Sequence, residues 1–261
     1  MMKQQRYDQI LSHLNLKGYL TVDDAVELLQ TSRSTVSRDF NDLAKNELVI
    51  RTHGGIGLPK RSDFRNLPYA LRQIKNNDEK EMIARAAVAL LHERDTLFLD
   101  GGTTTLQVAS FLPARGLTVV TNSLHHASQI IENQKPDAPV EVFIAGGLVY
   151  APWHVNIGPQ TRYCLEQYHA TWAFFSAKGI DKHGIYNHNE LIVESERTMI
   201  ANAEKVVLLA DHTKFSERSV FFLCELKEID ILITDEHPKS KELLKEIADA
   251  GVEVITVSEK S

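Results

Sequence analysis

The chain has 261 residues, of which 43% are hydrophobic and 25% are charged, and its formal net charge is −6. This length fits one large domain or a small domain followed by a medium one, with enough apolar residues for a sizeable core. No apolar run approaches the ~20 residues that span a bilayer, and residues 1–14 lack the apolar segment of a signal peptide. We therefore expect a cytoplasmic protein without a membrane partner, in which Cys164 and Cys224 are reduced thiols.

The charge is divided unevenly along the chain. Residues 1–61 contain nine Lys and Arg against seven Asp and Glu, whereas residues 62–261 contain twenty against twenty-eight. A slightly basic N-terminal part permits local contact with nucleic acid, while the acidic remainder argues against a nucleic-acid-binding surface over the whole chain.

Three helices are predicted near the N-terminus. Apolar residues recur at helical spacing over residues 4–14, and Gly18 ends that helix. Thr21 is a good N-cap for a second helix over residues 22–29, and Ser32 caps a third helix. The inward face of the third helix consists of three apolar residues: Val36, Phe40 and Leu43.

The second and third predicted helices, joined by a tight polar turn, form the helix-turn-helix pattern. Short hydroxyls and arginines suit a helix that enters the major groove, because they reach bases and phosphates without blocking entry. The alternative is a solvated polar face on a small three-helix module. The outward residues that we expect to contact DNA are Arg33, Ser34, Thr35, Ser37, Arg38 and Asn41.

A two-stranded wing is predicted after the third helix. The β-branched run 48–50 leads into polar residues and then into Gly54 and Gly55, which suit a turn. A wing in this position meets the DNA backbone or the minor groove, so Arg51 and His53 are further candidate contacts. Residues 1–57 are therefore expected to form an α+β winged helix-turn-helix domain.

The N-terminal part resembles the DNA-binding domain of the DeoR family of bacterial transcription regulators. The resemblance rests on Arg6, Ile10 and Leu14, on Ser32 with the run 35–40, and on the wing run 51–55. One departure concerns base preference. The family usually carries two arginines before the aspartate of this run, where this chain has Ser37 and Arg38.

The rest of the chain is predicted to be an α/β domain. Residues 58–76 mix proline, charge and isolated apolar residues and indicate a linker. Over residues 77–261, short apolar strands alternate with amphipathic helices, which implies a mostly parallel sheet covered on both faces. In such sheets ligands bind at the carboxyl ends of the strands.

The run 97–105, with the sequence LFLDGGTTT, has the features of an anion site. A buried strand leads through two glycines into a helix that opens with threonines. The first amides of a helix lack internal partners and carry partial positive charge, and threonine hydroxyls add donors. An ordinary strand-to-helix turn with good caps is the alternative interpretation.

Small, polar or ionic residues also follow four other predicted strands. For two of them a plain structural interpretation stays open: Asp181 to Gly184 fits a hairpin turn, and Asp211 with Lys214 fits a surface ion pair. The four strand ends are residues 121–123, 146–147, 178–181 and 211–214.

The body resembles the C-terminal domain of the DeoR family, which is similar in fold to ribose-phosphate isomerase. The matching runs include 99–104, 119–123, 179–181 and 210–215. The resemblance implies a site for a phosphorylated sugar or related metabolite that alters operator affinity. The implied effector-binding residues are Asp100, Gly101, Gly102, Thr103, Thr104, Thr105, Asn122, Ser123, Lys178, Asp181, Glu190 and Lys214.

Two departures from the family pattern bear on the ligand. Gly101 stands where the family often has serine or alanine, and the run 150–154 replaces a plain polar loop. Within that run, Trp153 and His154 either line the pocket or pack a subunit interface. The histidines show no metal-ligand spacing, so we expect neither a metal nor a cofactor.

The leading hypothesis is a DNA-binding transcription regulator without enzymatic activity. It would repress a carbohydrate operon, bind operator DNA as a homodimer or homotetramer, and be released by a phosphorylated sugar or related metabolite. The alternative is an isomerase-like enzyme with an accessory DNA-binding head, in which Asp100, Asp181 or Glu190 acts as a general base. A third possibility is a sensor of a non-phosphorylated sugar derivative.

Overall fold

The structure is a computed structural model, and it divides the chain into two compact units, Met1–Asn77 and Asp78–Ser261. Residues 58–68 of the predicted linker lie outside the described residues. The residues that the structure describes are 3–45, 48–57, 69–113, 116–134 and 140–258.

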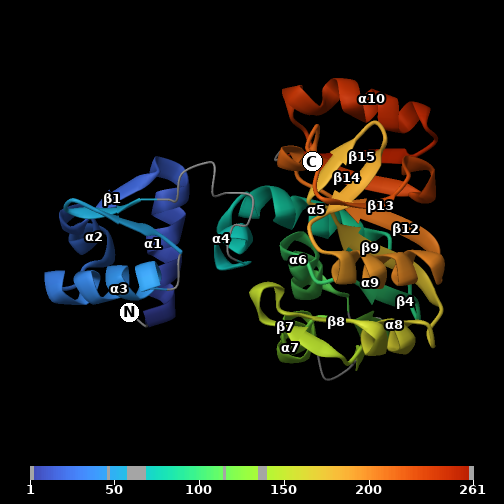
Figure 1. Cartoon of the computed structure of the whole chain (residues 1–261), viewed down its shortest axis with the longest axis horizontal. Helices are drawn as coiled ribbons and strands as arrows, with labels where there is room; N and C mark the ends of the chain where they lie inside the picture. The colour runs from blue at the N-terminus through green and yellow to red at the C-terminus, as the bar shows by residue number, and fades with distance from the viewer. Residues whose placement is uncertain (1–2, 46–47, 58–68, 114–115, 135–139, 259–261) are drawn as a thin grey trace. The chain divides into compact units, whose positions relative to one another are not determined.

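The N-terminal unit packs its helices and a small antiparallel sheet around one apolar core (Figure 1). Ile10, Phe40 and Leu43 are fully buried in that core, which confirms the predicted helix-turn-helix arrangement. The elements are α1 (Lys3–Lys17), β1 (Tyr19–Thr21), α2 (Val22–Leu29), α3 (Arg33–Lys45), β2 (Ile50–Thr52), β3 (Gly55–Gly57) and α4 (Tyr69–Ile74).

Strand β1 is an element of this head that the sequence pattern does not predict. It pairs antiparallel with β3, so the wing is part of a three-stranded sheet. A Cβ atom at Gly55 would lie 2.3 Å from the carbonyl oxygen of Leu20. Glycine at this position therefore lets β1 approach the wing. Three residues are too few for a period-2 pattern to indicate a strand.

An ion pair fastens α3 to α1. Arg6 Nε donates to Asp39 Oδ2 at 2.6 Å, and Arg6 Nη2 donates to Asp39 Oδ1 at 3.0 Å. The Asp39 side chain is 3% exposed and that of Arg6 is 14% exposed. The carboxylate that interrupts the polar run of α3 is thus turned into the protein, away from an anionic duplex.

The C-terminal unit is built on a seven-stranded parallel sheet with the order β15-β14-β12-β9-β4-β5-β6. This architecture confirms the predicted α/β class. The strands are β4 (Thr96–Leu99), β5 (Thr118–Thr121), β6 (Glu141–Ile144), β9 (Ala170–Ser176), β12 (Ala203–Leu209), β14 (Ile231–Asp235) and β15 (Glu253–Val257). The α-helices are α5 (Asn77–Ala89), α6 (Thr103–Phe111), α7 (Leu124–Glu132), α8 (Pro159–Leu165), α9 (Glu190–Ala201) and α10 (Lys241–Asp249).

Both faces of the sheet are covered by helices (Figure 1). Alternate strand residues join opposite cores, as the period-2 geometry of a strand requires. Phe174 packs with α5, α6 and α7, whereas its neighbour Phe175 packs with α9 and α10. This alternation explains why the strands read as continuous apolar runs in the sequence.

Two antiparallel features accompany the parallel sheet. The first is a hairpin of β7 (Leu148–Tyr150) and β8 (Val155–Ile157), joined by a 3₁₀ turn over Ala151–Trp153. The second is a small sheet of β10 (Gly179–Asp181), β11 (Gly184–Asn187) and β13 (Phe221–Cys224). Asp181 lies opposite Gly184 in the β10–β11 hairpin, so the hairpin-turn interpretation of this run is confirmed.

The strand order reverses between β4 and β9. The chain runs outward from β4 through β5 to β6, then returns to β9 and continues to the other edge. Crevices at such a switch point are where open α/β sheets bind ligands. The glycine–threonine loop after β4 lies at this point. Within the described residues, no helix is long and apolar enough to cross a membrane.

Replacing Asp39 with Asn should selectively weaken the N-terminal unit. The largely buried Arg6 guanidinium would lose the negative charge of Asp39, and weakening these charge-assisted hydrogen bonds should cost about 2 kcal/mol in local unfolding free energy. Native-state hydrogen exchange of the α1 and α3 amides measures this cost. Asp42→Asn is the matched control, because Asp42 pairs with the exposed Lys3 and little change is expected. Equal loss of protection in both variants would contradict the prediction.

Candidate DNA-binding face and effector site

The predicted DNA contacts lie on the outward side of α3 and on the wing. The side chains of Thr35 and Ser37 are half-buried, and the other predicted contacts are exposed. The exposed residues are Arg33, Ser34, Arg38, Asn41, Arg51 and His53. The contact of these residues with DNA stays a prediction.

The hydroxyls at the start of α3 bond to one another. Ser32 Oγ lies 3.0 Å from Ser34 Oγ and 2.9 Å from Thr35 Oγ1. Arg33 forms an ion pair with Asp23 on α2. Arg38, by contrast, has no ion pair or hydrogen bond within the described residues, so its guanidinium is available to an anionic partner.

The glycine–threonine loop is packed too closely to accept side chains at its two glycines. A Cβ atom at Gly101 would lie 2.0 Å from Val155 Cγ1, and one at Gly102 would lie 2.2 Å from Ser176 Oγ. The loop is therefore pressed between the β7–β8 hairpin and the end of β9. Glycine is needed here for close approach, since neither residue has a positive φ.

The three threonines after the glycines differ in their hydrogen bonds. Thr105 Oγ1 accepts from the Gly102 amide at 2.8 Å and donates to the Gly102 carbonyl at 3.0 Å. Within the described residues, the hydroxyls of Thr103 and Thr104 make no hydrogen bond. The amides of these first-turn residues likewise donate to no backbone carbonyl. Thr105 thus shapes the loop, and Thr103 and Thr104 leave donors for an anion.

The ring of His126, on α7, connects this loop to the start of α7 through its two nitrogens. One ring nitrogen, Nε2, lies 3.2 Å from Thr105 Oγ1, and Nδ1 lies 2.7 Å from Ser123 Oγ. The ring is fully buried. Burial and the nearby His125 lower the pKa of His126 to about 3, against the opposing effect of its contact with Gly102. His126 is therefore neutral at ordinary pH.

The predicted site residues Asn122 and Ser123 hold the β7–β8 hairpin. Ser123 Oγ donates to the His154 carbonyl at 3.1 Å. The Asn156 amide donates to the Asn122 carbonyl at 2.7 Å, and Asn122 Nδ2 contacts the Asn156 carbonyl at 3.3 Å. These bonds hold the hairpin against the end of β5.

Opposite charges meet at the end of β12, two strands from the loop. Asp211 is 1% exposed, so the surface-ion-pair interpretation of this run is wrong. Burial acts to raise the pKa of Asp211, but Lys214, the Thr213 hydroxyl and Lys80 together lower it to about 2. Lys80, on α5, is 3% exposed. Two strands span ~10 Å, within reach of a small phosphorylated ligand bound at the loop.

Two further acidic side chains, Asp100 and Glu196, are buried and interact electrostatically with each other. Asp100, which directly follows β4, is 4% exposed, and Glu196 of α9 is 1% exposed. Asn187 Nδ2 donates to Glu196 Oε1 at 2.6 Å. Burial and the negative charge of Asp100 raise the pKa of Glu196 well above its usual value, although the Asn187 contact acts to lower it.

The remaining predicted effector residues, Asp181, Glu190 and Lys178, lie outside the glycine–threonine loop. The Asp181 carboxylate accepts from the His183 amide and Tyr186 Oη, and it pairs with Arg218. Those bonds stabilise the β10–β11 hairpin. Glu190 is exposed and lines a groove between α9 and β13. Lys178 is half-buried at the end of β9, where its amide donates to the Tyr186 carbonyl.

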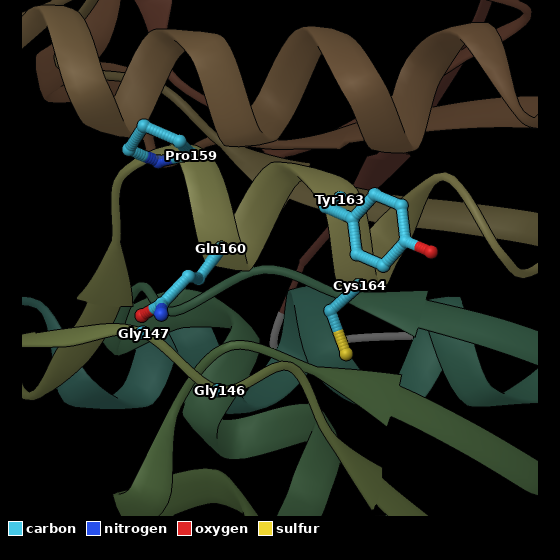
Figure 2. Close-up of a pocket in the computed structure, with 6 residues that line it drawn as sticks. All are labelled: Gly146, Gly147, Pro159, Gln160, Tyr163 and Cys164. Atoms are coloured by element: carbon cyan, nitrogen blue, oxygen red, sulfur yellow. The ribbon is translucent and has the colours of Figure 1, made fainter.

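A separate hollow lies beside the edge of the sheet, between the β6–β7 turn and α8 (Figure 2). Its lining contains no charged side chain, which makes it a poor match for a phosphate group. The predicted strand end at 146–147 belongs to this hollow. The lining residues are Gly146, Gly147, Pro159, Gln160, Tyr163 and Cys164.

The two units match two family models. Residues 6–62 match the DeoR-like helix-turn-helix domain, and residues 75–236 match the DeoR C terminal sensor domain. The chain belongs to the DeoR family. It therefore combines a DNA-binding head with a sensor domain, as transcription regulators of that family do.

Curated relatives agree with this assignment over most of their length. The HTH-type transcriptional repressor GlcR of Bacillus subtilis is 34% identical over 91% of this chain and 90% of the relative. The L-fucose operon activator of Haemophilus influenzae is 32% identical, covering 88% and 91%. The glycerol-3-phosphate regulon repressor of Escherichia coli is 31% identical, covering 91% and 93%. Ribose 5-phosphate isomerase A of Methanocaldococcus jannaschii has a TM-score of 0.39 and 17% identity, covering 54% of this chain and 55% of that one.

Three buried polar residues near the site are absent from the set that the sequence indicated. His126 and Glu196 occupy apolar stripes of their helices, Glu196 four residues after Ile192. A polar residue at such a position is a usable signal, because burying it requires a partner. Lys80 gave no such signal, since its stretch of α5 is rich in charge.

Unfolding of the C-terminal unit should depend on pH through His126. The unfolded ring takes up a proton below pH ~6.5, and the folded ring does so only near pH 3. Stability is therefore full above pH ~6.5 and falls by up to ~1.4 kcal/mol per pH unit below it. Both tryptophans, Trp153 and Trp172, lie in this unit. Their fluorescence in urea titrations between pH 7 and pH 4.5 measures the slope.

The His126→Gln variant should show a shallower slope than the unchanged chain, whatever its absolute stability. His92→Gln serves as the control, because the His92 side chain is 80% exposed. A slope that His126→Gln leaves unaltered would contradict the role of this ring.

Proposed function

We propose that this regulator binds a phosphorylated sugar or polyol at the glycine–threonine loop, and that binding alters its affinity for operator DNA. The observation that carries the proposal is the first turn of α6 at the switch point of the sheet. There, unpaired amides and the hydroxyls of Thr103 and Thr104 form a donor set for a phosphate. Lys214 and Lys80 supply positive charge two strands away.

The carbohydrate class is supported by the relatives. One relative is named for an L-fucose operon and another for the glycerol-3-phosphate regulon. One of these names describes an activator and the other a repressor. We propose repression, with the effector favouring a form that binds operator less tightly. The coupling is reciprocal, so operator DNA must then weaken effector binding by the same factor.

A homodimer or homotetramer is the assembly that we propose. A single helix-turn-helix head buries little surface on DNA, and paired half-sites require two heads. We also propose that the chain is not an enzyme. The isomerase alternative needs a general base beside a substrate carbon, and two of its three candidates, Asp181 and Glu190, lie in a hairpin turn and on an exposed groove. Turnover of pentose or hexose phosphates in a coupled assay would reverse this ranking.

Replacing Thr103 and Thr104 together with valine should abolish the response to effector without weakening DNA binding. The change removes two hydroxyl donors and preserves side-chain volume in the buried turn. Fluorescence anisotropy with labelled promoter DNA measures both properties, with a panel of sugar and polyol phosphates added to the complex. Thr256→Val, at an exposed position of β15, is the control. If effector still releases the double variant from DNA normally, the loop is a plain strand-to-helix turn and the proposal is wrong.

Replacing Arg38 with alanine should weaken DNA binding by about 1–3 kcal/mol. Its guanidinium has no partner within the described residues, so removing it leaves the head intact. Binding measured from 50 to 200 mM salt distinguishes the two roles of an arginine. A phosphate contact lowers the salt slope by ~1, whereas a base contact relaxes sequence preference. Lys17→Ala, at the exposed end of α1, is the control, and equal effects of the two changes would contradict the prediction.

A further inference from the structure

Glu196 is a buried carboxyl group that the proposed phosphate site does not explain. It lies in the middle of α9 between the buried residues Ile192 and Met199. Oε1 accepts from Asn187 Nδ2 at 2.6 Å, whereas Oε2 is buried and has no hydrogen-bond partner within the described residues. A buried carboxyl oxygen left without a partner is costly, so its presence in a native fold calls for an explanation.

The Glu196 side chain lies near the loop that we propose as the phosphate site. It interacts with Asp100, which directly precedes Gly101 and is 4% exposed. Burial and the negative charge of Asp100 raise the pKa of Glu196 well above its usual value, which favours the acid form of Glu196. The acid form donates as well as accepts a hydrogen bond, and Asp100 Oδ1 and Glu196 Oε2 are both buried without a hydrogen bond in the described residues.

A ligand hydroxyl matches this pair, because a hydroxyl both donates and accepts a hydrogen bond. A ligand carboxylate does not match it, because it adds a second negative charge beside the first. We infer that Glu196 and Asp100 bind the hydroxyl-bearing end of the effector and select a polyol or sugar phosphate over the corresponding acid phosphate. This inference rests on the proposed phosphate site at Thr103 and Thr104.

A chain of contacts links Glu196 to a tryptophan that can report on binding. Asn187, which donates to Glu196, has its Oδ1 2.7 Å from Nδ1 of His188. The His188 ring stacks on Trp153, with centroids 3.5 Å apart and planes tilted by 21°. A ligand that forms a hydrogen bond with Glu196 alters the hydrogen bond between Glu196 and Asn187. This change in turn alters the surroundings of the Trp153 indole. Trp172→Phe leaves Trp153 as the sole tryptophan, whose emission can be excited selectively.

The experiment compares ligands that differ only in their terminal group. D-Glucitol 6-phosphate and 6-phosphogluconate share chain length and phosphate, and glycerol 3-phosphate and 3-phosphoglycerate form a shorter pair. In each pair a terminal hydroxymethyl group stands against a carboxylate. Titration calorimetry and Trp153 fluorescence on the full chain measure affinity. In at least one pair, the hydroxyl member should bind about tenfold or more tightly than the acid, the difference that one charge-assisted hydrogen bond makes.

Glu196→Gln should narrow that preference to within about threefold, since an amide carries neither the acid proton nor the charge. Glu194→Gln is the matched control on the same helix. Within the described residues, the Glu194 carboxylate pairs only with Arg162, and the preference should persist. The preference of the unchanged chain for the hydroxyl ligands is measured without any variant. It therefore still tests the inference if the Glu196→Gln chain misfolds.

The outcomes separate the inference from the function on which it rests. Equal binding of both members of each pair, or a preference that Glu196→Gln leaves unchanged, would overturn the role of Glu196 and leave the phosphate site standing. If neither the four ligands nor inorganic phosphate binds, the phosphate site fails and the inference fails with it.

Discussion

The sensor domain depends on how closely three segments approach one another at the loop after β4. At Gly101 and Gly102 there is no room for a Cβ atom, because Val155 and Ser176 already occupy that space. Thr105 and His126 then fix the loop from inside through buried hydrogen bonds. Side chains in a close-packed interior cannot shift freely. The free amides at the start of α6 are therefore held in place before any ligand arrives, and a preorganised site loses less entropy on binding.

The polar residues around this loop divide into those that hold it and those that remain able to bind. Hydrogen bonds to one another and to the backbone engage the side chains of Thr105, Ser123 and His126. Within the described residues, the hydroxyls of Thr103 and Thr104 form no such hydrogen bond. A run of three threonines thus contains two kinds of residue, and only the three-dimensional contacts distinguish them. This division makes separate substitutions informative, because the loop can lose donors without losing its shape.

Periodicity sufficed for the larger elements of the fold. The apolar run before the glycine loop predicted β4, and the helical spacing over residues 4–14 and 22–29 predicted α1 and α2, within a few residues of their observed bounds. Three-residue strands such as β1 and β8 escaped, because their pairing is decided by distant partners and not by local pattern. For the candidate site, the loop itself was indicated by its residue types. Residue type alone did not separate the surroundings of Asp181 and Asp211. Asp181 lies in a hairpin turn, whereas Asp211 is buried in a cluster of charged groups.

The two departures from the family pattern in the sensor domain prove to be one structural feature. Gly101 replaces a serine or alanine that is common in the family, and the run 150–154 replaces a plain polar loop. In the folded chain that run is the tip of the β7–β8 hairpin, and Val155 lies where a side chain at position 101 would project. A larger residue at 101 would force the hairpin away from the loop and with it Trp153, which stacks on His188. The observed position of the hairpin therefore requires glycine at position 101. A side chain at position 101 is therefore compatible only with a displaced hairpin or with a residue smaller than Val155.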